Sequence, residues 1–145
     1  MHDHLHEARA HREGLRDAVG KVERSLAAPA ASRYEPWSKE LGDELQDLGA
    51  ALERHIAATE APGGLLDEIL QEEPRLARRI AALRDDHVYL RERLTEARLA
   101  LPHDADGVPA ARDRVVELLE AVIRHRHRGA DVVYEAYLVD MEAGD

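Results

Sequence analysis

The stretch "PWSKELGDELQDLGAALERHIAAT", residues 36–59, repeats apolar side chains at steps of three and four residues. An α-helix advances about 3.6 residues per turn, so this spacing places them on one face of a helix. The inward face is expected to comprise Trp37, Leu41, Leu45, Leu48, Leu52, His55, Ile56 and Thr59. Pro36 suits the first turn of such a helix, and Pro62 marks its end. The stretch therefore predicts a long amphipathic helix.

Three other segments show the same period, at residues 3–27, 74–97 and 109–137. Proline, glycine and small polar residues gather between the four segments, which indicates short connections. A short segment, "GLLDEIL" at 64–70, predicts an additional turn or two of helix. No alternating pattern is long enough to predict a strand. The chain is therefore expected to form one all-α domain over residues 1–145, an antiparallel up-down four-helix bundle.

Composition narrows the possible partners. Thirty acidic against twenty basic side chains give a formal net charge of -10, which repels nucleic acid and anionic membrane surfaces. No apolar run approaches the roughly 18 residues of a membrane-spanning helix, and the absence of cysteine excludes disulfides and thiolate metal sites. These features predict a cytoplasmic protein that binds neither nucleic acid nor membranes. No nucleotide-binding or nucleophile motif is present, which favours a binding protein over an enzyme.

Histidines interrupt the inward faces of three segments. His11, His55 and His87 each fall on an apolar stripe. A buried imidazole needs a partner for its polar nitrogens, and one shared metal ion would satisfy a nitrogen on every ring. Glu60 lies about 140° further round the helix than His55, so it is expected to reach the bundle axis only if that helix frays toward Pro62. The structural alternative is that each ring is a core histidine with an ordinary hydrogen bond.

The last segment contains "VIRHRHRGADVVYEAY", residues 122–137. A helical wheel places Arg126 on the inward face and His125 about 120° away, facing solvent. His127 and Asp131 are four residues apart on the flank of the same helix, so they are the candidate ligands from this segment. An inward arginine is expected to reach solvent or to pair with a carboxylate. The candidate carboxylates are Asp131, Glu60 and Asp86.

The order of the helices, the inward histidines and "RGADVVYEAY" at 128–137 resemble the hemerythrin-like family, the bacterial HHE cation-binding domains. The resemblance covers nearly the whole chain. It implies a four-helix bundle that holds iron, usually two ions on seven ligands, with dioxygen or peroxide as further ligands. It also implies a role in the sensing, storage or redox handling of iron or oxygen species.

Position by position, His11, His55, His87 and Asp131 match ligands of that family. Three ligand positions differ, because Thr59 stands four residues after His55, no second histidine stands four residues from His87, and Arg126 stands five residues before Asp131. The reduced set predicts one metal ion, iron, with manganese or zinc as the alternatives. The predicted ligands are His11, His55, Glu60, His87, His127 and Asp131. A second hypothesis is a metal-free bundle of the same ancestry that serves as an interaction or stress-associated module.

Overall fold

The computed structural model describes residues 3–139 as a bundle of four long helices, with no strand in that range. The four are α1 (Asp3–Ala27), α2 (Tyr34–Glu60), α4 (Ala77–Leu99) and α5 (Val108–Val133). Shorter elements are α3 (Leu65–Glu72), the 3₁₀ turns Pro74–Leu76 and Ala105–Gly107, and a π-helical end at Tyr134–Val139. The all-helical prediction is confirmed at this level. Among the same residues, no helix combines the length and apolar character that crossing a bilayer requires.

The helix boundaries follow the predicted ones closely. The second long helix begins at Tyr34 instead of Pro36, since the backbone N–H of Trp37 already bonds to the carbonyl of Arg33. Proline is tolerated there because a residue in the first turn has no intrahelical acceptor to lose. At Pro74 the chain forms a 3₁₀ turn before α4 begins at Ala77. The segment at 64–70 is a true helix, α3.

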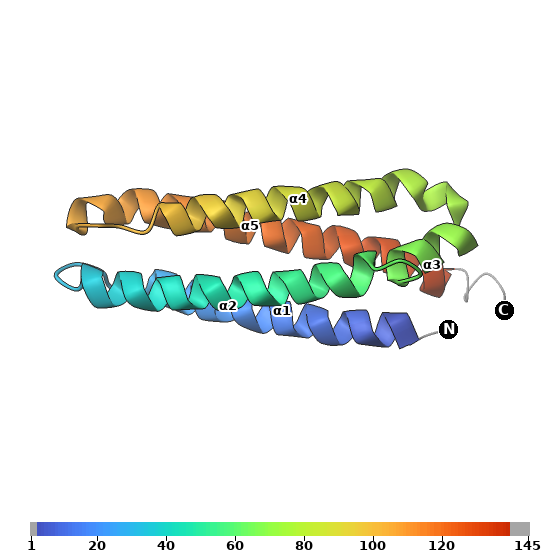
Figure 1. Cartoon of the computed structure of the whole chain (residues 1–145), viewed down its shortest axis with the longest axis horizontal. Coiled ribbons are helices and arrows are strands. Elements are labelled where there is room, and N and C mark those ends of the chain that lie inside the picture. The colour runs from blue at the N-terminus through green and yellow to red at the C-terminus, as the bar shows by residue number, and fades with distance from the viewer. Residues whose placement is uncertain (1–2, 140–145) are drawn as a thin grey trace.

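Figure 1 shows α1 lying beside α2 and α4 beside α5, as two pairs that pack together. The α1–α2 and α4–α5 connections lie at one end of the bundle, and α3 lies at the other. Buried apolar side chains form two clusters. The larger occupies the end with the two connections and includes Leu15, Leu45 and Leu118, whereas the smaller lies under α3 and includes Ile69 and Leu83.

The end opposite α3 is held by Arg112 of α5. Its guanidinium donates hydrogen bonds to the carbonyls of Leu26 and Ala28, at 2.6 and 3.1 Å. The same group lies over the Trp37 ring, 5.1 Å from its centroid, and Trp37 Nε1 donates to the carbonyl of Ser25. Since carbonyls at a helix end lack intrahelical donors, Arg112 ties the end of α1 to α5.

We predict that Arg112→Ala lowers the free energy of unfolding by about 1–3 kcal/mol, because two carbonyls lose their donor and Trp37 loses its cation. Urea denaturation measures the loss. Arg114→Ala is the matched control, since Arg114 makes an exposed pair with Glu117, and pairs of this kind contribute less than about 1 kcal/mol. Equal losses in the two variants would contradict the role given to Arg112.

Candidate metal centre

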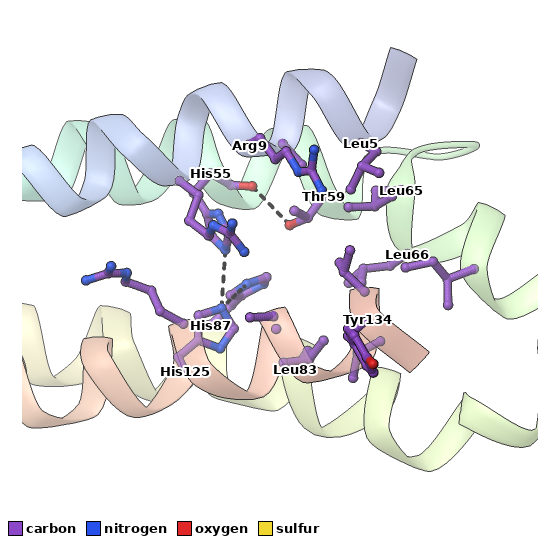
Figure 2. Close-up of a pocket in the computed structure, with 18 residues that line it drawn as sticks. Leu5, Arg9, His55, Thr59, Leu65, Leu66, Leu83, His87, His125 and Tyr134 are labelled. Atoms are coloured by element: carbon purple, nitrogen blue, oxygen red, sulfur yellow. Dashed lines mark hydrogen bonds between the residues drawn. The ribbon is translucent and has the colours of Figure 1, made fainter. Parts of the chain in front are cut away.

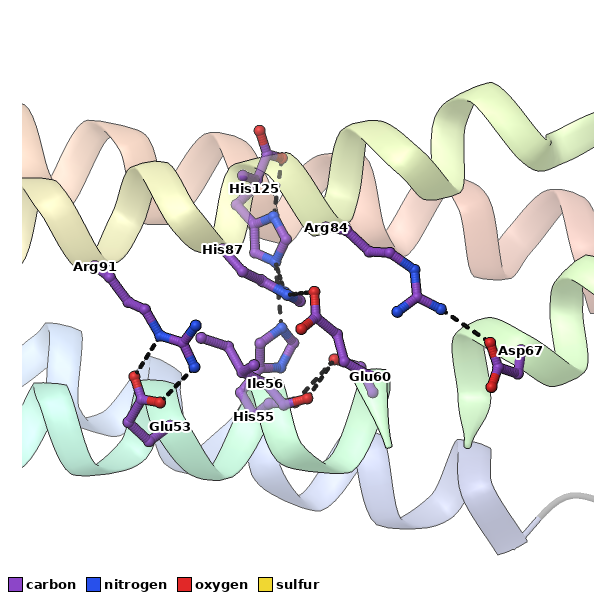
Figure 3. A network of polar contacts seen from close by, with 11 residues as sticks. Glu53, His55, Ile56, Glu60, Asp67, Arg84, His87, Arg91 and His125 are labelled. Atoms are coloured by element: carbon purple, nitrogen blue, oxygen red, sulfur yellow. Dashed lines mark hydrogen bonds and ion pairs between the residues drawn. The ribbon is translucent and has the colours of Figure 1, made fainter. Parts of the chain in front are cut away.

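Three buried histidines from three helices meet between the two apolar clusters. His55 belongs to α2, His87 to α4 and His125 to α5, and their side chains face one another across the bundle (Figure 3). Nε2 of His125 lies 3.0 Å from Nε2 of His87 and 3.2 Å from Nε2 of His55. One nitrogen of each ring lies within 4.8 Å of a nitrogen of both others.

The sequence positions explain this convergence. His55 directly precedes the buried Ile56, and His87 lies four residues after the buried Leu83, so both continue the apolar stripes of their helices. His125 lies three residues after the buried Val122 and seven before Val132, which places it on the buried face of α5. Each ring therefore occupies a core position in its helix.

Carboxylates orient two of the rings. Nδ1 of His87 lies 2.8 Å from Oε1 of Glu60, and Nδ1 of His125 lies 2.9 Å from Oδ2 of Asp86. The other oxygen of Asp86 accepts a hydrogen bond from Arg128 at 2.8 Å. An ionised carboxylate can only accept hydrogen bonds, so Nδ1 of each ring carries the proton and donates it. The lone pair of each neutral ring is consequently on Nε2.

These tautomers leave a conflict at the centre of the cluster. The Nε2 lone pairs of His87 and His125 face each other at 3.0 Å, with no proton between them. His55 can donate from its own Nε2 to His125, yet this satisfies only one of the two lone pairs. A cation bound by all three nitrogens would remove the conflict, and rings held by carboxylates in this manner are typical of metal ligands.

Burial keeps the three rings neutral. Desolvation, reinforced by the neighbouring His125, lowers the pKa of both His55 and His87 from 6.5 to about 3. Burial also lowers the pKa of His125, although its hydrogen bond to Asp86 opposes the shift. A histidine binds metal only in its neutral form, so all three rings are in the form that a metal ion requires.

The distances also fit a metal ion. Zinc binds imidazole nitrogen at about 2.0–2.1 Å, so two such nitrogens are about 2.9 Å apart at a right angle and about 3.3 Å apart at the tetrahedral angle. The separations of His125 Nε2 from His87 and from His55, 3.0 and 3.2 Å, lie within this range, and the nitrogens of His55 and His87 lie within 4.8 Å of each other. Among residues 3–139, this is the one group of three side chains placed to hold an ion.

A cavity of about 220 Å³ adjoins the cluster. Figure 2 shows the three histidines at one end of this cavity and Leu65, Leu66 and Leu83 at the other. The three protein nitrogens leave coordination positions free on a bound ion, and the cavity provides space for a further ligand beside the rings.

The structure brings together three of the side chains singled out from the sequence and separates the others. His55 and His87 are in the cluster, and Glu60 contacts it through Nδ1 of His87 instead of through the central nitrogens. His11 of α1 is not part of the three-histidine group, although it lies near enough to His55 to act on it electrostatically; 32% of its side chain is exposed, and its Nε2 lies 4.0 Å from Glu7. His127 and Asp131 are both exposed on α5. Thr59 donates its hydroxyl to the carbonyls of His55 and Ile56 in its own helix.

The prediction that His125 faces solvent is wrong, since its exposed fraction is 4%. The helical wheel takes Arg126 as the centre of the inward face. Moving that centre by one residue rotates the predicted face by about 100°. Leu118 and Ala121, both buried on α5, mark the true face, and His125 lies four residues beyond Ala121. Arg126 is half-buried and has no ion pair within residues 3–139, so the expected pairing with Asp131, Glu60 or Asp86 does not occur there.

Fold and site together define a helical bundle with a buried three-histidine cluster. Comparison with protein-family models, with curated proteins and with solved structures found no match to this chain.

We predict that acid destabilises the metal-free protein through these histidines. Between pH 6.5 and about 3 the unfolded chain binds more protons than the folded one, because the pKa of His55 and of His87 is lowered to about 3. The free energy of unfolding is therefore greatest above pH 6.5. It falls as the pH decreases, by about 1.4 kcal/mol per pH unit for each such histidine.

Urea denaturation of chelator-treated protein at pH 7 and pH 5.5 measures this slope. His55→Leu removes one titrating ring and should reduce the slope. It should also stabilise the protein at pH 5.5, since the Nδ1 of His55 has no hydrogen-bond partner. His103→Leu, at an exposed position, is the control. Parallel pH profiles for wild type and His55→Leu would contradict the prediction.

Proposed function

We propose that this chain binds one divalent transition-metal ion through Nε2 of His55, His87 and His125. The observation that supports the proposal most strongly is the pair of facing Nε2 lone pairs on His87 and His125, 3.0 Å apart, each fixed by a carboxylate on the other nitrogen. Buried polar atoms in such an arrangement are costly without a cation. The metal would provide a Lewis acid with free coordination positions beside the cavity.

The donor set narrows the choice of metal. Three neutral imidazoles suit zinc, iron and copper better than manganese, which prefers oxygen donors. Glu60 and Asp86 bring two negative charges next to the ligands, which balances a divalent ion without their binding it directly. Iron or zinc is therefore the proposed cofactor, with manganese as the weaker alternative.

We also propose that the chain is a hemerythrin-like protein, as its sequence resemblance implies. An antiparallel up-down arrangement of the hemerythrin-like kind, in a cytoplasmic protein that handles iron, dioxygen or peroxide, is consistent with three inward histidines on consecutive long helices. This chain would then hold a single ion on a reduced ligand set, in which α5 contributes His125. His11, His127 and Asp131 would not be ligands, because none of them reaches the cluster.

A metal-free bundle that serves as an interaction or stress-associated module is the second candidate. It is supported by the packing of the rings, which meet edge to face with centroids 4.6 to 5.4 Å apart. Aromatic rings favour this arrangement without any ion between them. Elemental analysis separates the two candidates.

We predict that the protein, purified without an affinity tag from cells supplied with iron, contains close to one equivalent of metal by plasma mass spectrometry. His125→Gln should lose that metal, because one of three ligands is removed. His127→Gln is the matched control, two residues away on the same helix but exposed, and should retain it. A wild-type protein without metal that also takes up no iron or zinc on reconstitution would support the metal-free candidate.

We further predict that Asp86→Asn weakens metal binding about 10- to 100-fold, the usual loss when a carboxylate behind a histidine ligand is replaced. The amide would orient the His125 ring less firmly and would place its NH₂ group toward either Nδ1–H or Arg128. Competition with a chelator of known affinity measures the change. Asp85→Asn, the exposed neighbour, is the control and should bind metal like wild type. Equal affinities for all three proteins would contradict the role given to Asp86.

A further inference from the structure

The cavity beside the histidines has two chemically different ends. The apolar end includes Leu65, Leu66 and Leu83 (Figure 2), which belong to the same apolar cluster as Ile69. The three histidines form the other end, and Arg9 and Arg12 of α1 and Arg126 of α5 also line the cavity. An apolar space with a few polar groups gathered at one end is the usual form of a small-molecule site.

Three arginines line this cavity, and among residues 3–139 none of them forms an ion pair. Within residues 3–139, Arg9, Arg12 and Arg126 have neither an ion pair nor a side-chain hydrogen bond to an acid. Three other arginines near the site do form ion pairs, Arg84 with Asp67, Arg91 with Glu53 and Arg128 with Asp86. The chain has a formal net charge of -10, so carboxylates are abundant. Arg9 is exposed, whereas Arg12 and Arg126 are half-buried, and these two unpaired arginines therefore indicate a site for an anion from outside the chain.

Arg126 is the most confined of the three. Its Nε is buried and has no hydrogen-bond partner. Arg12 and Arg16 lie close enough to Arg126 to repel it, and Glu23 lies close enough to attract it without forming an ion pair. Arg12 also lines the cavity beside His55. Arg12 and Arg126 thus create a positive potential at the end of the cavity where the neutral ring of His55 lies.

We propose that this cavity binds a small organic monocarboxylate, with its carboxylate at the Arg12 and Arg126 end and its apolar body among Leu65, Ile69 and Leu83. Guanidinium groups recognise carboxylates through charge-assisted hydrogen bonds, and the leucines provide a dry surface for the remainder of the ligand. The arginines recognise the ligand, so the proposal does not depend on a metal at the histidines.

The size of the cavity limits the ligand. An engineered cavity of about 150 Å³ in another protein holds benzene, which has six heavy atoms. At the same packing, a cavity of about 220 Å³ corresponds to roughly nine heavy atoms. Benzoate has this size and one negative charge, and benzamide has the same shape without the charge. This pair of probes separates recognition of the carboxylate from simple filling of an apolar space.

Titration calorimetry with the protein as purified tests the proposal. Benzoate should bind at least about tenfold more tightly than benzamide, and Arg126→Gln should remove that difference, since one charge-assisted contact contributes about tenfold or more. Arg124→Gln is the matched control, since it removes the same charge from an exposed position on the same helix that does not line the cavity. Equal binding of the two probes, no binding of benzoate, or equal losses in the two variants would overturn the proposal.

A second variant tests the cavity by filling it. A Cβ added at Gly129, which lines the cavity, meets no other atom within 4 Å, so Gly129→Leu should close the site without strain. Gly14→Leu is the control, because Gly14 has the same free space on α1 but does not line the cavity. Gly129→Leu should abolish benzoate binding while its thermal unfolding and metal content stay at wild-type values. Unchanged benzoate binding in Gly129→Leu would overturn the assignment to this cavity.

Discussion

The convergence of three imidazoles at the centre of the bundle is the constraint on which the rest of the site depends. Polar rings replace apolar side chains at His55, His87 and His125, and each is buried. A leucine at any of these positions would pack without needing a partner, whereas an imidazole needs one for each nitrogen. Glu60 and Asp86 accept hydrogen bonds from the outer nitrogens of His87 and His125 and thereby fix the inward lone pairs of these two rings. The carboxylates therefore determine what the centre can bind, although they do not face it.

The histidine cluster also lies between two halves of the bundle that are packed differently. On one side, Leu45, Leu118 and their neighbours form a continuous core, and Arg112 holds the ends of the helices together. On the other side, α3 covers a smaller apolar cluster that leaves the cavity. Helix packing in the first half can hold α2, α4 and α5 in register, so the second half can include a space without losing the fold. A metal ion would join the same three helices at the boundary between the halves.

The leucine stripe of residues 36–59 predicted the helix, its inward face and His55, because one dominant period leaves little choice of orientation. His87 followed for the same reason, since Leu83 and Leu90 flank it at helical spacing. The buried face of the segment at 122–137 is harder to predict, because histidine and arginine alternate there and no regular apolar residues mark the inward side. Its wheel was therefore centred one residue too far along, and Arg126 was assigned the position that His125 occupies. Glu60, the last residue of α2, remains helical and contacts the outer nitrogen of His87 instead of the bundle axis.

Charge links the histidine cluster to the neighbouring arginines. The two carboxylates that face the cluster are engaged with the rings, and one of them also holds Arg128, so neither is available to Arg12 or Arg126. A divalent ion at the centre would increase the positive potential at this end of the cavity, and the burial of Arg126 Nε makes that potential harder to screen. The histidines are neutral, and Glu60 and Asp86 are already bonded to them. The charge of Arg12 and Arg126 therefore has no ion-pair partner among the described residues at the cavity. A small anion that enters the cavity is the group that would compensate it, and its apolar body would occupy the space under α3 that the chain leaves unfilled.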